Sequence, residues 1–106
     1  MFYVEKTKYR MTDLTKAKLK ICGRVQGVFY RQATCQKATA LGLWGWVKNM
    51  DDGTVEAEVA GPTQHIDELI AWCWQGPPAS HVKDFQVTWQ DQALDISMSA
   101  PRFKIL

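Results

Sequence analysis

Two glycines, Gly23 and Gly27, lie four positions apart between a segment with strand periodicity and a segment that can form a helix. A glycine-containing turn of this kind can bring backbone N–H groups together around an anion, and the positive end of the helix dipole strengthens the attraction. Arg31 follows in the first turn of the expected helix, and its planar guanidinium group can bind two phosphate oxygens. The stretch Gly23–Arg31 therefore predicts a phosphate site, although Arg31 by itself could be an ordinary solvated helix residue.

The segments on either side of this stretch have the patterns that such a site needs. Residues 17–21 alternate between apolar side chains and lysines, which predicts a strand. The residues after the glycines predict a helix that runs to about Leu41, with Gly42 as its C-terminal stop. The stripe of this helix consists of Tyr30, Thr34, Ala38 and Leu41.

The rest of the chain adds a hairpin, a second helix and two further strands. Residues 43–49 and 54–60 are rich in strand-forming residues and are joined by an Asp-Asp-Gly turn, which predicts the hairpin. The second helix is predicted by an apolar stripe at helical spacing, and Gly76-Pro77-Pro78 ends it. That stripe consists of Ile66, Leu69, Ile70 and Cys73. Residues 82–89 predict a fourth strand, and Phe103 and Ile105 a short final one.

The order of these elements predicts the fold class. A β-α-β-β-α-β order with one tight hairpin predicts an α+β fold of the ferredoxin-like type, in which both helices cover one face of an antiparallel sheet. The last strand would be a short addition at the C-terminus. We expect a single domain over residues 15–106, preceded by a flexible N-terminal tail at residues 1–14 that has no sustained period.

The composition excludes several classes of protein. The chain has 106 residues, of which 46% are hydrophobic and 23% charged, and its formal net charge is +2. This charge argues against a nucleic-acid partner, which usually requires a concentrated basic face. No segment is apolar enough for a signal peptide or a membrane span. We therefore expect no membrane partner.

The cysteines indicate a reducing compartment. Cys22, Cys35 and Cys73 are odd in number, widely spaced and without a C-x-x-C pair. This spacing argues against a disulfide scaffold and a structural zinc site, and it favours a cytoplasmic location. One disulfide between two of the three remains open. We expect a monomer that holds no metal.

Two stretches of the sequence carry a family resemblance. Gly23-Arg24-Val25-Gln26-Gly27-Val28-Phe29-Tyr30-Arg31 resembles the first signature of the acylphosphatases. Gly45-Trp46-Val47-Lys48-Asn49, followed by Gly53, Val55 and Gly61, resembles their second signature. The similarity runs from about Ala17 to the C-terminus. Tyr30 departs from the family, which usually has Phe at this position, and the N-terminal tail is longer than usual.

The resemblance implies a metal-independent enzyme that hydrolyses small acyl phosphates to a carboxylate and inorganic phosphate. It implies that Arg31 holds the phosphate, that backbone amides of a loop cradle it, and that Asn49 orients the attacking water. The loop residues are Gly23, Arg24, Val25, Gln26, Gly27, Val28 and Phe29. It further implies that no cofactor is needed and that inorganic phosphate inhibits as the product.

The residue types agree with this chemistry, because an acyl phosphate has a good leaving group. The departing carboxylate has a conjugate acid with a pKa of about 4, so no general acid has to protonate it. What remains is to position water in line with the leaving oxygen and to stabilise the charge on the phosphoryl oxygens. His65 and His81 lie outside the glycine loop and fit ordinary surface histidines.

Other interpretations remain open from the sequence. Asp51 and Asp52 could bind magnesium beside Asn49, but an Asp-Asp-Gly stretch is chiefly turn chemistry. The alternatives for function are a non-catalytic ferredoxin-like binding module and an accessory acylphosphatase-like domain of a larger transfer system. In the first, Trp44 and Trp46 would stack RNA bases, although the basic stripe of such a surface is missing.

Overall fold

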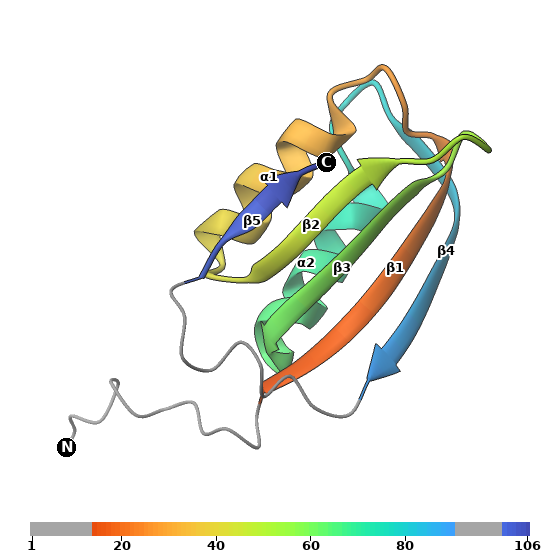
Figure 1. Cartoon of the computed structure of the whole chain (residues 1–106). Helices are drawn as coiled ribbons and strands as arrows, with labels where there is room; N and C mark the ends of the chain where they lie inside the picture. Colours follow the sequence, from red (N-terminus) through yellow and green to blue (C-terminus); the bar gives the residue numbers. More distant parts are fainter. Residues whose placement is uncertain (1–13, 91–100) are drawn as a thin grey trace, which may run out of the picture.

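The computed structural model describes residues 14–90 and 101–106, and the predicted α+β class is confirmed there (Figure 1). The elements follow in the order β1 (Leu14–Arg24), α1 (Tyr30–Ala40), β2 (Trp44–Asn49), β3 (Val55–Pro62), α2 (Thr63–Gln75), β4 (His81–Gln90) and β5 (Phe103–Ile105). The predicted β-α-β-β-α-β order with a short final strand is therefore correct. No helix in these two ranges is long and apolar enough to cross a membrane.

The five strands form one mixed sheet in the order β4-β1-β3-β2-β5. The four longer strands pair antiparallel with their neighbours, as predicted, whereas β5 pairs parallel with β2. The sheet is therefore not antiparallel throughout. β5 follows β4 in the sequence but lies at the opposite edge of the sheet. The periodicity of a three-residue strand carries no information about its direction.

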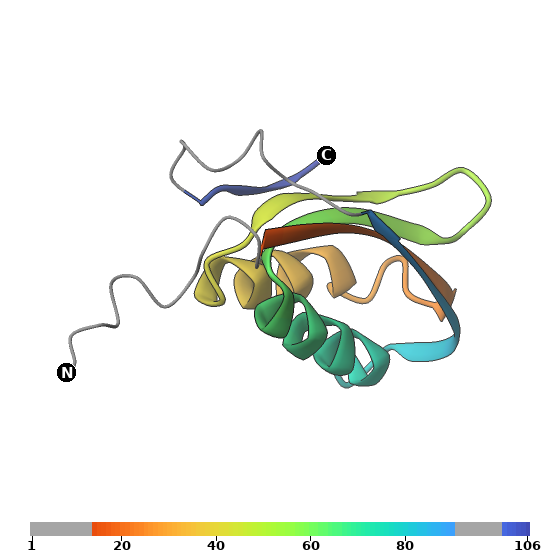
Figure 2. The ribbon, with the colours of Figure 1, turned by 90° about the horizontal axis from the view of Figure 1, so that it is seen from below.

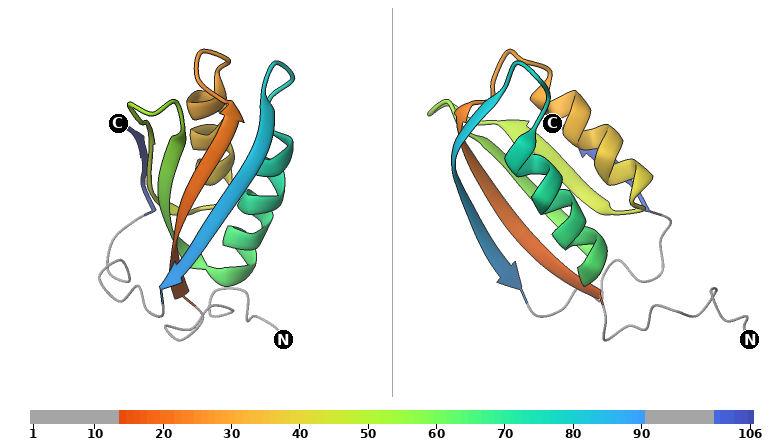
Figure 3. Two further views of the ribbon diagram at one scale, coloured as in Figure 1. Left: turned by 90° about the vertical axis from the view of Figure 1, so that its right-hand side faces the viewer. Right: turned by 180° about the vertical axis from the view of Figure 1, so that it is seen from behind.

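Both helices pack on the same face of the sheet (Figure 2), and the core lies between the two layers. The view from behind in Figure 3 shows α1 and α2 side by side across the strands. The predicted stripes face this core, with Leu41 and Ile70 only partly buried at its margin. Strand residues Ala17, Leu19 and Ile21 are fully buried as expected. Burial of this shared apolar face is the main source of stability for the fold.

β1 is longer than the sequence predicts. It begins at Leu14, which pairs with Pro62, so the predicted tail over residues 1–14 ends one position too late. Residues 1–13 lie outside the described residues. At its other end β1 continues to Arg24 beside β4. Pairing with neighbours on both sides extends the strand beyond the short alternating run that the sequence displays.

Three strands are aligned so that one end of the sheet carries the glycine stretch and the hairpin together. Ile21 of β1 pairs with Val55 of β3, and Val55 pairs in turn with Asn49 of β2. After Ile21 only β4 continues beside β1, and the register shifts between Cys22 and Gly23. A Cβ atom at Gly23 would collide with the backbone carbonyl of His81, so the close approach of β4 requires glycine there.

Tyr30 links the start of α1 to the end of α2. Its ring is buried, and its hydroxyl donates a hydrogen bond of 2.6 Å to the backbone carbonyl of Cys73. In a continuing helix that carbonyl would accept from the N–H of residue 77, but Pro77 has none. The Tyr30 hydroxyl therefore supplies the donor that proline lacks. This contact gives the hydroxyl of Tyr30 a structural role.

Replacing Tyr30 by phenylalanine should lower the free energy of unfolding by about 1–3 kcal/mol, because a buried carbonyl loses its donor. Urea unfolding of Tyr30→Phe against the parent chain measures this, with the slope of the transition expected to stay the same. Tyr30→Leu, which also loses the ring, should cost more. Equal stability of Tyr30→Phe and the parent would show that the hydrogen bond contributes nothing.

Two neighbouring groups keep their protons in the folded chain. Burial raises the pKa of the Cys73 thiol from 9.0 to about 12, although the nearby hydroxyls of Tyr30 and Thr34 work in the opposite direction. Burial also raises the pKa of the Tyr30 hydroxyl well above its ordinary value, and the nearby Cys73 adds to the effect. Each group thus loses its proton more readily in the unfolded chain than in the folded one.

Stability should therefore fall as the pH rises above about 9, where the unfolded chain releases protons that the folded chain retains. The slope approaches about 1.4 kcal/mol per pH unit for each such proton. Denaturation at a series of pH values from 7 to 11 would measure it (roughly the span over which thiol and phenol ionise). Cys73→Ala should give a shallower decline than the parent. An identical decline in both proteins would contradict the retained proton on Cys73.

Candidate active site

The loop between β1 and α1 lies beside the β2–β3 turn, at one end of the sheet (Figures 1 and 3). Two of the predicted loop residues, Gly23 and Arg24, are the last residues of β1 and pair with β4. The loop itself covers residues 25–29. Val25 and Val28 bury their side chains in the core and so anchor it. Gly27 lies between them with a φ of 75°, and the space a Cβ atom would take there is open.

The N-cap residue of α1 provides no capping side chain. Phe29 occupies the N-cap position with a φ of 64°, and its side chain has no polar atom that could cap the helix. No acidic residue follows in the first turn. Its side chain is 75% exposed, so packing within the described chain does not offset the strained backbone. The first N–H groups of a helix that lacks a capping side chain attract anions, and the helix dipole adds to this attraction.

A cavity of about 160 Å³ opens at this helix end. It is lined by Val25, Gly27, Phe29, Tyr30, Arg31, Gln32 and Asn49. The structure thus brings together the two predicted catalytic residues, Arg31 and Asn49, with part of the loop. Gly23, Arg24, Gln26 and Val28 do not line this cavity, and neither histidine does.

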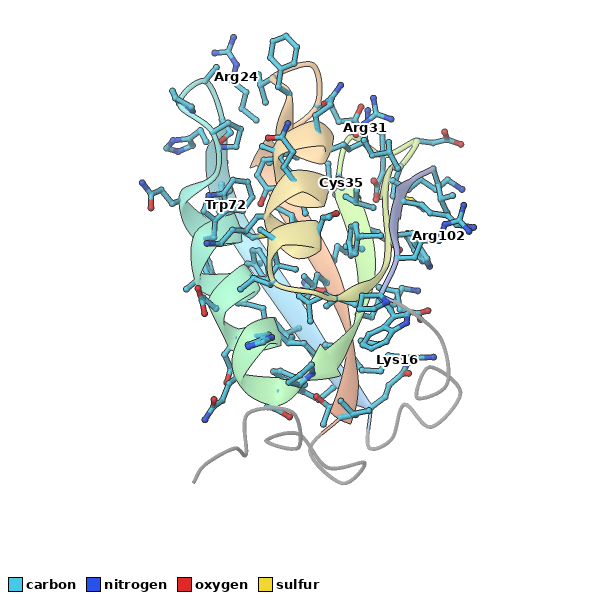
Figure 4. The ribbon with its side chains drawn as sticks, turned by 90° about the vertical axis from the view of Figure 1, so that its left-hand side faces the viewer. Lys16, Arg24, Arg31, Cys35, Trp72 and Arg102 are labelled. Atoms are coloured by element: carbon cyan, nitrogen blue, oxygen red, sulfur yellow. The ribbon has the colours of Figure 1, made fainter. Side chains whose placement is uncertain are left out.

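Arg31 brings an uncompensated positive charge to the cavity. Its side chain is half-buried, and it forms no ion pair with a carboxylate in residues 14–90 or 101–106. Figure 4 shows Arg31 at the same end of the molecule as Arg24 and far from Lys16. An arginine beside an uncapped helix N-terminus produces a local positive potential that favours a phosphate group.

Asn49 presents an unsatisfied acceptor. Its Oδ1 atom is buried and has no hydrogen-bond partner in the part of the chain that the structure describes. A buried acceptor without a donor costs about 1–3 kcal/mol, so a bound water or ligand would stabilise it. Asn49 also lines a larger hollow of about 310 Å³ on the hairpin side. Asn49 is therefore the residue that the two hollows share.

Asp52 of the hairpin is held by hydrogen bonds within the turn. Asp52 accepts hydrogen bonds from the backbone N–H and the hydroxyl of Thr54, at 3.0 and 2.6 Å. These hydrogen bonds, with a contribution from Lys20 at 3.8 Å, lower the pKa of Asp52. Asp52 thus shows the turn chemistry that its sequence predicts. Within the described ranges no group of three His, Cys, Asp or Glu residues is arranged to hold a metal ion.

Comparison with known proteins identifies the relatives of this chain. Residues 17–105 match the family model described as acylphosphatase. The chain is 45% identical over 82 residues to an acylphosphatase of Pelotomaculum thermopropionicum, covering 77% of this chain and 89% of that protein. It is 43% identical over 93 residues to an acylphosphatase of Anaeromyxobacter dehalogenans, covering 88% of this chain and all of that protein, 100%.

A solved structure agrees with these matches. The crystal structure of acylphosphatase from Bacillus subtilis superposes with a TM-score of 0.79 at 34% sequence identity, covering 87% of this chain and 98% of that one. The chain therefore belongs to the acylphosphatase family, whose members hydrolyse acyl phosphates.

Proposed function

We propose that Arg31 and the amides at the start of α1 bind the phosphoryl group of the substrate, and that Asn49 holds the water that attacks it. One observation carries this proposal. A single cavity is lined by an arginine without an ion-pair partner in the described chain and by an asparagine whose buried Oδ1 lacks a donor. The first fits a dianion, and the second fits a water molecule.

The phosphoryl group would be bound chiefly by positive potential. Arg31 can donate two parallel hydrogen bonds to its oxygens. The N–H groups of α1 that carry no cap, together with the loop around Gly27, would donate to the others. Gly27 suits this role because no side chain occupies the space beside its backbone. Donors fixed before the substrate arrives stabilise the charge that spreads over the equatorial oxygens in the transition state.

Asn49 would hold the attacking water by accepting a hydrogen bond from it at Oδ1. The water oxygen then forms a bond to phosphorus while the bond from phosphorus to the acyl oxygen breaks. The electron pair of the broken bond leaves with the carboxylate, and the second product is inorganic phosphate, which retains the proton lost by the water. Because the carboxylate is a weak base, this step needs no acid at the leaving oxygen.

The alternative of an RNA-binding module gains no support from the sheet. Trp44, one of the two rings that would have to stack on bases, is partly buried and packs against Ala60. Lys18 and Lys20 on β1 are paired with Glu56 and Asp52, so the lysines of this strand do not form an open basic stripe.

Arg31→Ala and Asn49→Ala should lose activity in different ways. Arg31→Ala should reduce kcat/KM for an acyl phosphate by about 10³-fold or more and abolish competitive inhibition by inorganic phosphate. Asn49→Ala should reduce kcat by about 10²–10³-fold while phosphate still inhibits, because the anion-binding groups remain. Steady-state kinetics with inorganic phosphate as inhibitor measures both effects.

Arg102→Ala is the matched control, since it removes an exposed arginine that does not line the cavity (Figure 4). It should retain the parent rate. A fully active, correctly folded Arg31→Ala protein would contradict the role of Arg31. Loss of phosphate inhibition in Asn49→Ala would show that Asn49 binds the anion rather than the water.

Chelation should leave the rate unchanged, because none of the proposed groups acts through a metal ion. Phosphate release from an acyl phosphate would be measured before and after treatment with EDTA. A loss of rate that added magnesium restores would instead assign a catalytic role to the hollow lined by Asp51 and Asp52.

A further inference from the structure

The side chain of Gln26 joins the loop to the hairpin. Its Nε2 atom donates two hydrogen bonds, one of 2.8 Å to the carbonyl of Met50 and one of 2.9 Å to the carbonyl of Thr54. These two residues face each other at the base of the turn, where the N–H of Met50 donates to the Thr54 carbonyl at 2.8 Å. Both hydrogens of one amide group are thus used on the hairpin that carries Asn49.

These two hydrogen bonds connect the loop and the hairpin beyond the point where strand pairing between β1 and β3 ends. The pairing of β1 with β3 ends at Ile21 and Val55, and beyond it β1 pairs only with β4. Among the hydrogen bonds of the described residues, those that join residues 25–29 to residues 49–54 both come from Gln26. The residue that follows Asn49 is therefore tied directly to the loop that lines the phosphate cavity.

We propose that Gln26 is a positioning residue that fixes Asn49 relative to the phosphate-binding loop. This inference rests on the proposed function, in which the loop side holds the phosphoryl group and Asn49 holds the water. Water and phosphorus must be aligned within a fraction of an ångström, and a misplacement of about 1 Å can cost about 10²-fold in rate. The double hydrogen bond holds the distance between the two halves of the site, while Gln26 itself does not line the cavity.

The chemistry of the amide is specific to this role. Two carbonyl oxygens require two donor hydrogens at one point, and a glutamine amide supplies both without a charge. Gln26→Met keeps a neutral, unbranched side chain of similar length but cannot donate. It therefore removes the link without adding charge near the bound phosphate. Gln36→Met is the matched control, because Gln36 is an exposed residue of α1 outside the cavity.

The test is a double-mutant cycle with a separate measure of phosphate binding. The kinetics of the parent, Gln26→Met, Asn49→Ala and the double variant would be compared, with inorganic phosphate as competitive inhibitor. Gln26→Met should lower kcat by about 10- to 100-fold, while the inhibition constant of phosphate and the circular dichroism spectrum stay as in the parent. In the Asn49→Ala background the same substitution should change kcat by less than about twofold, because the two residues act as a unit.

Several outcomes would overturn the inference. If the losses from Gln26→Met and Asn49→Ala multiply, Gln26 does not act through Asn49. If Gln26→Met weakens phosphate inhibition at an unchanged kcat, it shapes the anion site alone. An unchanged rate in folded Gln26→Met, or a loss equally large in Gln36→Met, contradicts it outright. If Gln26→Met does not fold, the same kinetic measurements on Gln26→Ala decide between these outcomes.

Failure of the proposed function would look different. A fully active Asn49→Ala protein would remove both Asn49 from the mechanism and the route by which Gln26 acts. An inactive Asn49→Ala protein with multiplying losses would overturn the role of Gln26 alone.

Discussion

The antiparallel pairing of three strands is the constraint on which the site depends. Ile21, Val55 and Asn49 form one row across β1, β3 and β2, so Ile21 lies about 10 Å, two strand spacings, from the asparagine, and the loop after Arg24 begins at this end of the sheet. A shift of one residue in either pairing would turn Asn49 to the opposite face of the sheet. The buried faces of these strands oppose such a shift, because each would have to expose its apolar residues.

Around this row the chain leaves several polar groups unsatisfied at one place. The N-terminus of α1 has neither a capping side chain nor an acidic residue, Phe29 holds a left-handed backbone, and Oδ1 of Asn49 lacks a donor within the described residues. Each feature costs stability in the free protein. In the proposed function, a bound phosphate would satisfy the N–H groups of the helix and a water would satisfy Oδ1 of Asn49. Between Tyr30 and Cys73, by contrast, the buried hydroxyl and the backbone carbonyl satisfy each other.

Local patterns predicted the elements, and the two residues predicted as catalytic, Arg31 and Asn49, line one cavity. Alternation and helical spacing encode the strands and helices, and Gly27, Arg31 and Asn49 lie in two recognisable stretches. The parallel direction of β5, the extension of β1 and the contacts of Gln26 and Tyr30 could not be predicted. These depend on partners 24 to 43 positions away, or on the strand at the far edge of the sheet. Such partners leave no periodic trace in the sequence.

The most direct test of this account is a crystal structure of the protein with bound vanadate, which adopts the five-coordinate geometry of phosphoryl transfer. The account predicts equatorial oxygens held by Arg31 and by the backbone N–H groups of the loop and α1. It predicts that one apical oxygen lies within hydrogen-bonding distance of Oδ1 of Asn49, about 2.5–3.0 Å. Vanadate bound at this loop with both apical oxygens remote from Asn49, or bound on the aspartate side of the hairpin, would contradict it.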